Sequence, residues 1–413
     1  MKSLYITSLK VPLLNALNIK INMKKEESAD LLLENDLPDI EEIAKRIEQL
    51  GIFENVYIFE NKPIDGIKKY VKNQTRKTIQ ECIYNSGKEF IYNVKSKIYK
   101  EYKFKNKILY CKDVNLKLYD KLYLCSFSDF VFNTIDIMYK HNLKEISILE
   151  GSIKDYLFDA SLLFLNRYTK CIVNIYIYDK YCIVWEGRYN INIYNIKKLD
   201  KNDNAFVKKI NYIFNVPDNL ELINNKIIFF DQVAEPMPLY LKKYTFLKKL
   251  LLRNAYTKHK IEDDFFCIKS RIFEELYYLC KTDINIFKKL CIKLHPRTNK
   301  GIPKKYYEFS LIGERNNRNN IPWEIYLLNN KIKNCILITM YSTSIISEIY
   351  NFNNYESNNR FILLYKLYNI EYMKDKKETD LFINKLKNKC NKLYAVESKE
   401  ELISVLFNEK SND

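Results

Sequence analysis

Residues 3–60 decide the fold: SLYITSLKVPLLNALNIKINMKKEESADLLLENDLPDIEEIAKRIEQLGIFENVYIFE. Short runs of β-branched and aromatic residues alternate here with longer segments whose apolar residues recur at helical spacing. Gly51 follows the second helical segment, as expected of a residue that ends a helix. This strand–helix–strand–helix order predicts an α/β layer with a mainly parallel sheet. The expected elements are strands at 3–7, 30–33 and 55–60 and helices at 13–23 and 39–50.

The same alternation returns further along the chain. The polar stretch after residue 195 predicts a linker between about 198 and 222, so we expect domains over 1–210 and 211–413. Two α/β halves of this kind form a cleft at their interface, where ligands usually bind. The further expected elements are strands at 122–126, 145–150, 226–231, 290–294, 335–340, 360–365 and 393–396, helices at 129–140, 244–255 and 273–280, a β-hairpin of 172–178 and 181–186 that turns at Asp179-Lys180, and a last helix with a capping box of Ser398 and Glu401.

Composition excludes several classes of protein. The 413 residues are 47% hydrophobic and 14% aromatic, which excludes a disordered chain, and the net charge is +17. Ten cysteines, none in C-x-x-C spacing, and three histidines argue against a zinc site of usual spacing and fit a reducing compartment. No uncharged apolar run reaches 18 residues, so no membrane-spanning helix is predicted. We therefore expect a cytoplasmic protein.

Missing motifs narrow the enzyme classes further. The seven glycines form neither a P-loop nor a dinucleotide-binding fingerprint, which argues against kinases, ATPases and dehydrogenases. The nucleophile elbow of α/β-hydrolases is also missing. No Asp-x-Asp pair occurs, although a metal-dependent nucleotide-sugar transferase would normally use one to hold its cation. The sequence therefore favours chemistry that needs neither a bound metal nor a dinucleotide.

Candidate chemistry lies at the ends of predicted strands, where open α/β sheets bind ligands. Leu149-Glu150-Gly151-Ser152 places a carboxylate and a glycine at one strand end; the alternative interpretation is a solvated loop glutamate. His295 follows another strand, is fixed by Pro296, and has Arg297 beside it, which suits an anionic phosphate with histidine as general acid. A lone histidine is otherwise usually structural.

Further candidates come from the same predicted half. Ser342, Thr343 and Ser344 precede a helix, where hydroxyls and free N–H groups can bind an anion or simply cap the helix. Glu324, after Pro322-Trp323, could accept two ribose hydroxyls. Asp231 ends the first strand of this half and is either an alternative base or an ordinary turn residue.

The chain carries three short motifs in a fixed order: an acidic residue before glycine, then His-Pro, then a Ser/Thr group. This order resembles that of the bacterial sialyltransferases of the two-Rossmann (GT-B) type, which form glycosyltransferase families 38, 52 and 80. The motifs are Glu150-Gly151, His295-Pro296 and Ser342-Thr343-Ser344, and their placement is most similar to family 52, the lipooligosaccharide and capsule sialyltransferases. One departure is Leu149, which stands where the motif's first acidic residue is expected.

The resemblance implies two Rossmann-like domains, an N-terminal one for the acceptor and a C-terminal one for a CMP-sugar. It implies inverting transfer from CMP-sialic acid to a galactose-type hydroxyl, without a metal or other cofactor. Glu150 would take the acceptor proton and His295 would protonate the leaving phosphate. Gly151 and Ser152 are acceptor-side candidates. The residues implied on the CMP-sugar side are Pro296, Arg297, Glu324, Ser342, Thr343 and Ser344.

Other interpretations stay open. The basic segment 240–260 predicts either an amphipathic helix on an anionic membrane surface, on the inner face of the plasma membrane, or an ordinary domain helix. A homodimer is a further expectation from the resemblance. A different CMP-linked sugar, such as an octulosonic acid, and a member that binds without turnover are alternatives. The high positive charge and 34 tyrosines also fit a nucleic-acid-binding protein, but the lysines are dispersed and no such motif occurs.

Overall fold

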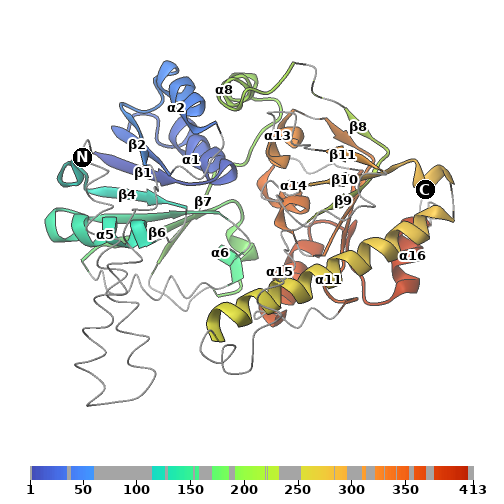
Figure 1. Cartoon of the computed structure of the whole chain (residues 1–413). Helices are drawn as coiled ribbons and strands as arrows, with labels where there is room; N and C mark the ends of the chain where they lie inside the picture. The colour runs from blue at the N-terminus through green and yellow to red at the C-terminus, as the bar shows by residue number, and fades with distance from the viewer. Residues whose placement is uncertain are drawn as a thin grey trace, which may run out of the picture. The chain divides into compact units, whose positions relative to one another are not determined.

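A computed structural model shows two compact units: Met1–Lys180 with Trp185–Lys197, and Tyr181–Val184 with Lys198–Asp413 (Figure 1). The division falls between Lys197 and Lys198, whereas the sequence analysis set it at 210. Position 210 lies inside helix α8 (Asn204–Phe214), in which Phe206, Ile210, Ile213 and Phe214 are buried while the lysines are exposed. The structure describes residues 2–34, 39–59, 114–125, 129–151, 154–157, 170–185, 191–218, 220, 222–231, 253–282, 284–294, 309–312, 321–329, 331–340, 342–352, 358–368 and 376–407.

The N-terminal unit contains a sheet in the order β3-β2-β1-β4-β5-β6-β7, and every described pair of neighbours is parallel. Its central strands are continuous apolar runs because helices cover both faces of such a sheet. The strands are β1 (Ser3–Thr7), β2 (Ala29–Glu34), β3 (Val56–Phe59), β4 (Lys121–Leu124), β5 (Glu145–Leu149), β6 (Ile172–Ile177) and β7 (Asn192–Asn195).

The helices of this unit follow from their apolar spacing. In α2, Ile40, Ile43, Ala44 and Ile47 are buried at helical intervals, and the opposite face is charged. Gly51 has a φ of +59°, the left-handed conformation that favours glycine after a helix. The helical elements here are α1 (Lys10–Asn22), α2 (Ile40–Gln49), α5 (Asp129–His141), α6 (Lys154–Leu157) and the 3₁₀ turn η1 (Leu116–Leu118).

The predicted hairpin at Asp179-Lys180 is wrong. Strand β7 pairs with β6 in parallel, so the position beside β6 is already taken. The chain after β6 instead forms a 3₁₀ turn, η2 (Lys180–Cys182). Cys182 and Ile183 are apolar because they are buried in the other unit, where Lys385 donates to the Ile183 carbonyl. Their hydrophobicity therefore reflected burial of a loop and not a second strand.

The C-terminal unit contains a parallel sheet in the order β11-β10-β9-β13-β14-β15. Strands β8 (Ile223–Asn224) and β12 (Ile332–Lys333) pair in parallel with each other and form a separate two-stranded sheet. The six strands are β9 (Ile227–Phe230), β10 (Leu290–Lys293), β11 (Ser310–Ile312), β13 (Ile336–Thr339), β14 (Arg360–Leu363) and β15 (Leu393–Ala395).

A long helix, α11 (Arg253–Lys281), packs on this unit (Figure 1). Its Phe273 ring lies 5.7 Å from that of Phe229 in β9, and Lys399 of α16 lies 3.3 Å from its Glu275. Among the described residues, no helix combines the length and apolar composition needed to cross a bilayer. The other helical elements are α12 (Ile284–Phe287), α13 (Trp323–Leu328), η4 (Thr343–Ile345), α14 (Ser347–Asn351), α15 (Lys376–Lys387) and α16 (Lys399–Phe407).

The last helix begins with one of the two hydrogen bonds of the predicted capping box, while the other joins Glu401 to Glu397 in place of Ser398. The Ser398 hydroxyl accepts the Glu401 N–H at 3.1 Å, while the Glu401 carboxylate reaches back to the Glu397 N–H at 2.8 Å. The predicted helix at 244–255 and most of the basic segment 240–260 lie outside the described residues, which resume at Arg253.

Both sheets share one strand order. Numbered within each sheet, the first six strands run 3-2-1-4-5-6, the arrangement of doubly wound Rossmann folds, and the N-terminal sheet adds β7 as a seventh strand beside β6. The direction of winding reverses between β1 and β4 in one unit and between β9 and β13 in the other. The prediction of an α/β protein with two Rossmann-like domains is therefore confirmed. Such sheets bind ligands outside the carboxyl ends of their strands, near the reversal point.

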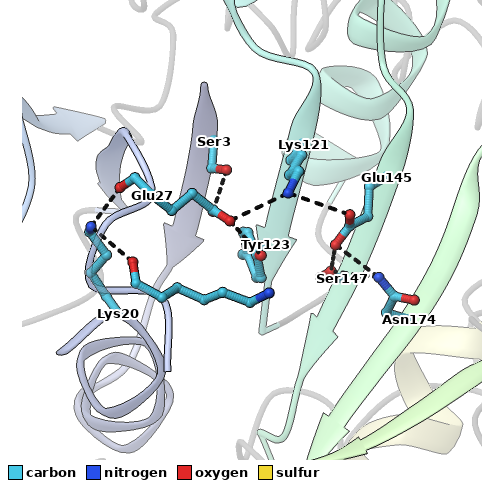
Figure 2. A network of polar contacts seen from close by, with 9 residues as sticks. Ser3, Lys20, Glu27, Lys121, Tyr123, Glu145, Ser147 and Asn174 are labelled. Atoms are coloured by element: carbon cyan, nitrogen blue, oxygen red, sulfur yellow. Dashed lines mark hydrogen bonds and ion pairs between the residues drawn. The ribbon is translucent and has the colours of Figure 1, made fainter. Parts of the chain in front are cut away.

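The amino ends of the N-terminal sheet are held by a polar network (Figure 2). Lys121 at the start of β4 lies between two carboxylates, 3.4 Å from Glu27 and 3.8 Å from Glu145. Glu145 also accepts bonds from Ser147 at 2.9 Å and Asn174 at 2.8 Å. This network links β4, β5, β6 and the loop before β2 at the edge opposite the predicted ligand edge. We interpret it as structural.

Candidate functional site

The predicted site residues follow strands at the carboxyl edges of the two sheets. Glu150 directly follows β5, Asp231 directly follows β9, and Ser342 comes shortly after β13. Because all neighbouring strands are parallel, residues that follow them gather at one edge of their own sheet. Ser152, His295, Pro296 and Arg297, and the Thr343 side chain, lie outside the described residues.

Glu150 is buried among polar groups of the N-terminal unit. Its Oε2 accepts the Tyr156 hydroxyl at 2.5 Å and the Tyr178 backbone N–H at 2.8 Å. Asn15 of α1 donates to the Glu150 carbonyl at 2.7 Å and accepts the Tyr178 hydroxyl at 2.9 Å. The Tyr156 hydroxyl and the Tyr178 N–H therefore fix the side chain of Glu150, and the Asn15 amide fixes its backbone carbonyl. Glu150 is not the solvated loop glutamate of the alternative interpretation, because only 3% of it is exposed.

This environment changes the acidity of Glu150. Burial raises the pKa of the carboxyl from an ordinary 4.5 to about 8, against the lowering effect of the two hydrogen bonds. The negative charges of Asp155 and Asp179 raise it further. The carboxyl is therefore mainly protonated at pH 7 and ionises in the range in which a general base is effective.

Gly151 is required by a close approach of two strand ends. A Cβ at this position would lie 2.7 Å from the Cys125 carbonyl oxygen, which follows β4. The Gly151 N–H donates to Asp155 Oδ2 at 2.7 Å, and the Asp155 carbonyl accepts the buried Trp185 indole N–H at 2.9 Å. Short helix α6 is thus fixed against the turn that carries Glu150. The sequence analysis singled out Gly151 as the residue of a tight turn, whereas the structure shows that a close contact requires it.

Asp231 forms a buried ion pair. Its carboxylate lies 3.0 Å from the Lys269 ammonium of α11, and neither side chain is exposed. The Asp231 N–H also donates to the Lys293 carbonyl at 2.9 Å, which joins it to the end of β10. Asp231 therefore carries a neutralised charge and ties α11 to the sheet at its reversal point.

Glu324 lies in the first turn of α13 and is 4% exposed. Burial raises the pKa of this carboxyl, while the Glu324 backbone N–H, the nearby Ser347 hydroxyl and the positive charge of Lys293 oppose the rise. Lys293 is itself buried at the end of β10. The C-terminal unit thus brings a carboxyl, a hydroxyl and an ammonium together at one sheet edge.

The Ser/Thr group forms a compact turn. The Ser344 N–H donates to Ser342 Oγ at 3.3 Å, and Ser347 Oγ donates to the Ser344 carbonyl at 2.8 Å. Ser342 and Ser344 are partly exposed. Helix α14 begins only at Ser347 and has five residues, so the predicted triplet lies in a 3₁₀ turn ahead of it. What the turn offers a ligand is therefore mainly its hydroxyl groups.

Several residues of these sites carry no signal in the sequence. Tyr156 and Tyr178 are not distinguishable among the 34 tyrosines of the chain, and no motif includes Ser347. Lys269 lies within a long helix among other charged residues, and nothing in the local pattern marks it as buried. Within the described residues, no group of three or more His, Cys, Asp or Glu side chains could hold a metal ion.

The fold and these sites define an α/β protein of two Rossmann-like units with buried carboxyl groups at its sheet edges. No protein-family model and no curated protein matches the chain. Among solved structures, it is similar to an α/β-galactoside α-2,3-sialyltransferase from the luminous marine bacterium Photobacterium phosphoreum, at 10% identity and a TM-score of 0.46 over 95% of this chain and 97% of that one.

A second similarity is to the N-terminal domain of Candida albicans trehalose-6-phosphate phosphatase. The identity is 11% and the TM-score 0.35, over 98% of this chain and 96% of that one. Both TM-scores are below 0.5, so neither similarity assigns an activity to this chain.

Proposed function

We propose that the chain is an inverting, metal-independent sialyltransferase that moves sialic acid from CMP-sialic acid to a galactose-type hydroxyl of a surface glycan. The observation that carries the proposal is Glu150: a carboxyl at the end of a parallel strand, with a pKa raised to about 8. A general base works best when its pKa is close to the working pH. The resemblance of the motifs around Glu150, His295 and Ser342 to family 52 supports the choice of donor.

The reaction is a single displacement. The acceptor oxygen bonds to the anomeric carbon as the bond from that carbon to the CMP phosphate breaks, and the electron pair leaves with CMP. Glu150, in its ionised form, takes the acceptor proton. His295 gives a proton or a hydrogen bond to the departing phosphate. Positive charge develops on the sugar ring in the transition state, so a leaving group stabilised by donors lowers the barrier.

The C-terminal unit would bind the nucleotide. Glu324 would accept the ribose hydroxyls, and Ser342, Thr343 and Ser344 would donate to the phosphate, with Pro296 and Arg297 beside His295. The shared sheet edge of Glu324 and the serines supports this assignment. The ion pair with Lys269 favours Glu150 over Asp231 as the base, because a proton on Asp231 would leave a buried ammonium without its counter-charge. Peripheral membrane contact and a homodimer belong to the same proposal.

The test is sialyl transfer to a fluorescent lactoside from CMP-sialic acid, with EDTA present. We expect product with the wild type and losses of about 100-fold or more with Glu150→Gln and His295→Ala. Activity in the Glu150→Gln variant would show that Glu150 is not the base. Loss of wild-type activity in EDTA would show that the reaction needs a metal. Failure of the wild type to bind CMP would refute the proposal. Transfer from a CMP-octulosonic acid instead would support the alternative donor.

A further inference from the structure

The two oxygens of the Glu150 carboxyl have different surroundings. Oε2 accepts two hydrogen bonds, one from the Tyr156 hydroxyl at 2.5 Å and one from the Tyr178 backbone N–H at 2.8 Å. A carboxylate oxygen has two lone pairs, so both acceptor positions of Oε2 are filled. Within the part of the chain that the structure describes, no hydrogen bond reaches Oε1. A proton that Glu150 takes up therefore binds to Oε1.

The Tyr156 hydroxyl is fixed through its neighbour in α6. The Asp155 carboxylate accepts the Gly151 N–H at 2.7 Å, and the Asp155 carbonyl accepts the Trp185 indole N–H at 2.9 Å. The Tyr156 side chain is fully buried, so bulk water does not readily replace its contact with Glu150. A hydrogen bond to an ionised carboxylate is roughly twice as strong as one between neutral groups. The tyrosine thus binds the ionised form of Glu150 more tightly than the protonated form.

We propose that Tyr156 is a positioning residue that occupies Glu150 Oε2 and leaves Oε1 as the atom that takes the proton of the acceptor hydroxyl. This inference rests on the proposed function, because it takes Glu150 as the base. It goes further in naming the reacting oxygen and the side chain that selects it. The proton passes from the acceptor oxygen to Oε1, while Tyr156 keeps its own proton and donates to Oε2 before and after the transfer.

The groups around Glu150 act in two directions. Burial and two nearby carboxylates favour the protonated form, whereas the Tyr156 hydroxyl and the Tyr178 N–H favour the ionised form. The two carboxylates are Asp155 of α6 and Asp179 beyond the end of β6. Helix α1 contributes the Asn15 amide, which does not titrate. A substitution can remove the Tyr156 donor, whereas Tyr178 donates from its backbone.

The test is kcat/KM for sialyl transfer in the wild type and in Tyr156→Phe, from pH 6 to 9.5. Tyr156→Phe keeps the buried ring and removes only the hydroxyl. Titration of His295 affects both enzymes alike, so the ratio of their rates reports the ionisation of Glu150. We expect the wild type to be about tenfold faster at pH 6.5, because loss of a hydrogen bond to a charged group raises the pKa of Glu150 by about one unit or more. The ratio should fall severalfold as the pH rises to 9.5.

Two outcomes would overturn the inference directly. A ratio that is the same at every pH would show that the role of Tyr156 is only structural. A Tyr156→Phe variant faster than the wild type at pH 9.5 would show that Oε2 takes the proton once its donor is removed, and the assignment of Oε1 would be wrong.

Tyr119→Phe is the matched control. Tyr119 is also buried in the N-terminal unit, and its hydroxyl donates to Asp30 Oδ2 at 2.6 Å. The substitution therefore removes the same kind of contact between a tyrosine and a carboxylate, away from Glu150. We expect its rate to match the wild type at every pH. A Tyr119→Phe variant with the pH dependence expected of Tyr156→Phe would mean that the effect does not come from Glu150.

A measurement without substrate separates this inference from the proposed function. The free energy of unfolding in urea is compared with and without Glu150→Gln, in the wild type and in Tyr156→Phe, from pH 5 to 10. In the wild type the difference grows with pH and levels off near the folded pKa of Glu150, about 8. In Tyr156→Phe it should level off about one pH unit later.

The two failures are then distinguishable. An unmoved unfolding profile would show that Tyr156 does not set the ionisation of Glu150, and this inference would be wrong even if the wild type transfers sialic acid. A shifted profile in a protein that transfers no sialic acid would instead refute the proposed function.

Discussion

The Asp231 carboxylate lies 3.0 Å from the Lys269 ammonium, with both side chains fully buried. Asp231 follows β9, the strand at which the C-terminal sheet reverses its winding, and Lys269 lies on α11. A charged contact therefore fixes the long helix to the carboxyl end of β9. Burial of two charges is costly, and each needs the other to remain charged.

We predict that Asp231→Ala lowers the free energy of unfolding by about 3–5 kcal/mol, because it leaves a buried ammonium without a partner. Urea denaturation of the full chain measures the loss. Replacing both residues, Asp231→Leu with Lys269→Met, should recover most of it. The control is Glu397→Ala, which breaks an exposed pair with Lys366 and should cost less than about 1 kcal/mol. Equal losses in Asp231→Ala and the control would contradict the prediction.

Glu150 gives the stability of the N-terminal unit a pH dependence. Its pKa is about 8 in the folded chain against an ordinary 4.5, so the folded state holds the proton more tightly. Stability is therefore unaffected below pH 4.5, falls as pH rises to about 8, and stays low above that, at up to about 1.4 kcal/mol per pH unit. Relative to wild type, Glu150→Gln should become more stable through this window, measured by urea denaturation at pH 5, 6.5, 8 and 9.

Asp155→Asn provides the matched comparison. It removes a negative charge that raises the pKa of Glu150, yet its amide oxygen can still accept the Gly151 N–H. The fall in stability should still begin near pH 4.5 but end at a lower pH, so that the total loss is smaller, because the folded pKa moves toward 4.5. A wild-type and Glu150→Gln difference that is flat with pH would show that Glu150 ionises normally.

Much of the fold could be predicted because strand runs in a parallel sheet are continuous and apolar. Ser3–Thr7 was predicted to the residue, and the other central strands to within one or two. The prediction failed where burial had another cause, as in the loop at Cys182 and Ile183. It also set a boundary inside α8, because the exposed lysines of an amphipathic helix read as a polar linker.

The site could be predicted only in part. Strand-end position identified Glu150 and Asp231, since local sequence shows where a strand stops, whereas Glu324 was proposed from the Pro-Trp-Glu segment and lies in helix α13. Their partners come from distant elements: Lys269 from α11 and Tyr178 from the end of β6. Such pairings depend on how helices pack onto the sheet. The spacing of residues along the chain does not determine that packing.

Gly151→Ala should destabilise the turn that carries Glu150. The added Cβ would lie 2.7 Å from the Cys125 carbonyl oxygen, so the ends of β4 and β5 would have to separate. We expect a loss of about 1–3 kcal/mol, the usual cost of overpacking, measured by thermal and urea unfolding. Gly51→Asn is the comparison, because no atom lies within 4 Å of a Cβ there and asparagine tolerates its positive φ. A Gly151→Ala variant as stable as wild type would contradict the contact.

Lys121→Met separates the structural edge of the N-terminal sheet from the proposed chemical edge. The lysine lies between Glu27 and Glu145, whose side chains are only 13% and 17% exposed, so its loss brings two carboxylates into uncompensated repulsion. We expect a loss of about 1–3 kcal/mol in the free energy of unfolding by urea. Lys144→Met removes a much more exposed lysine, 59% against 22% for Lys121, which lies 3.9 Å from Asp120, and should cost less than about 1 kcal/mol.

The kinetic part of this prediction distinguishes structure from catalysis. Lys121 lies at the start of β4, and Glu150 follows the end of β5, so the two belong to opposite edges of one sheet. At a temperature where the Lys121→Met variant is folded, kcat and KM for sialyl transfer should match the wild type. A stable variant with a changed kcat would mean that the polar network at the amino edge takes part in the reaction, and its assignment as structural would be wrong.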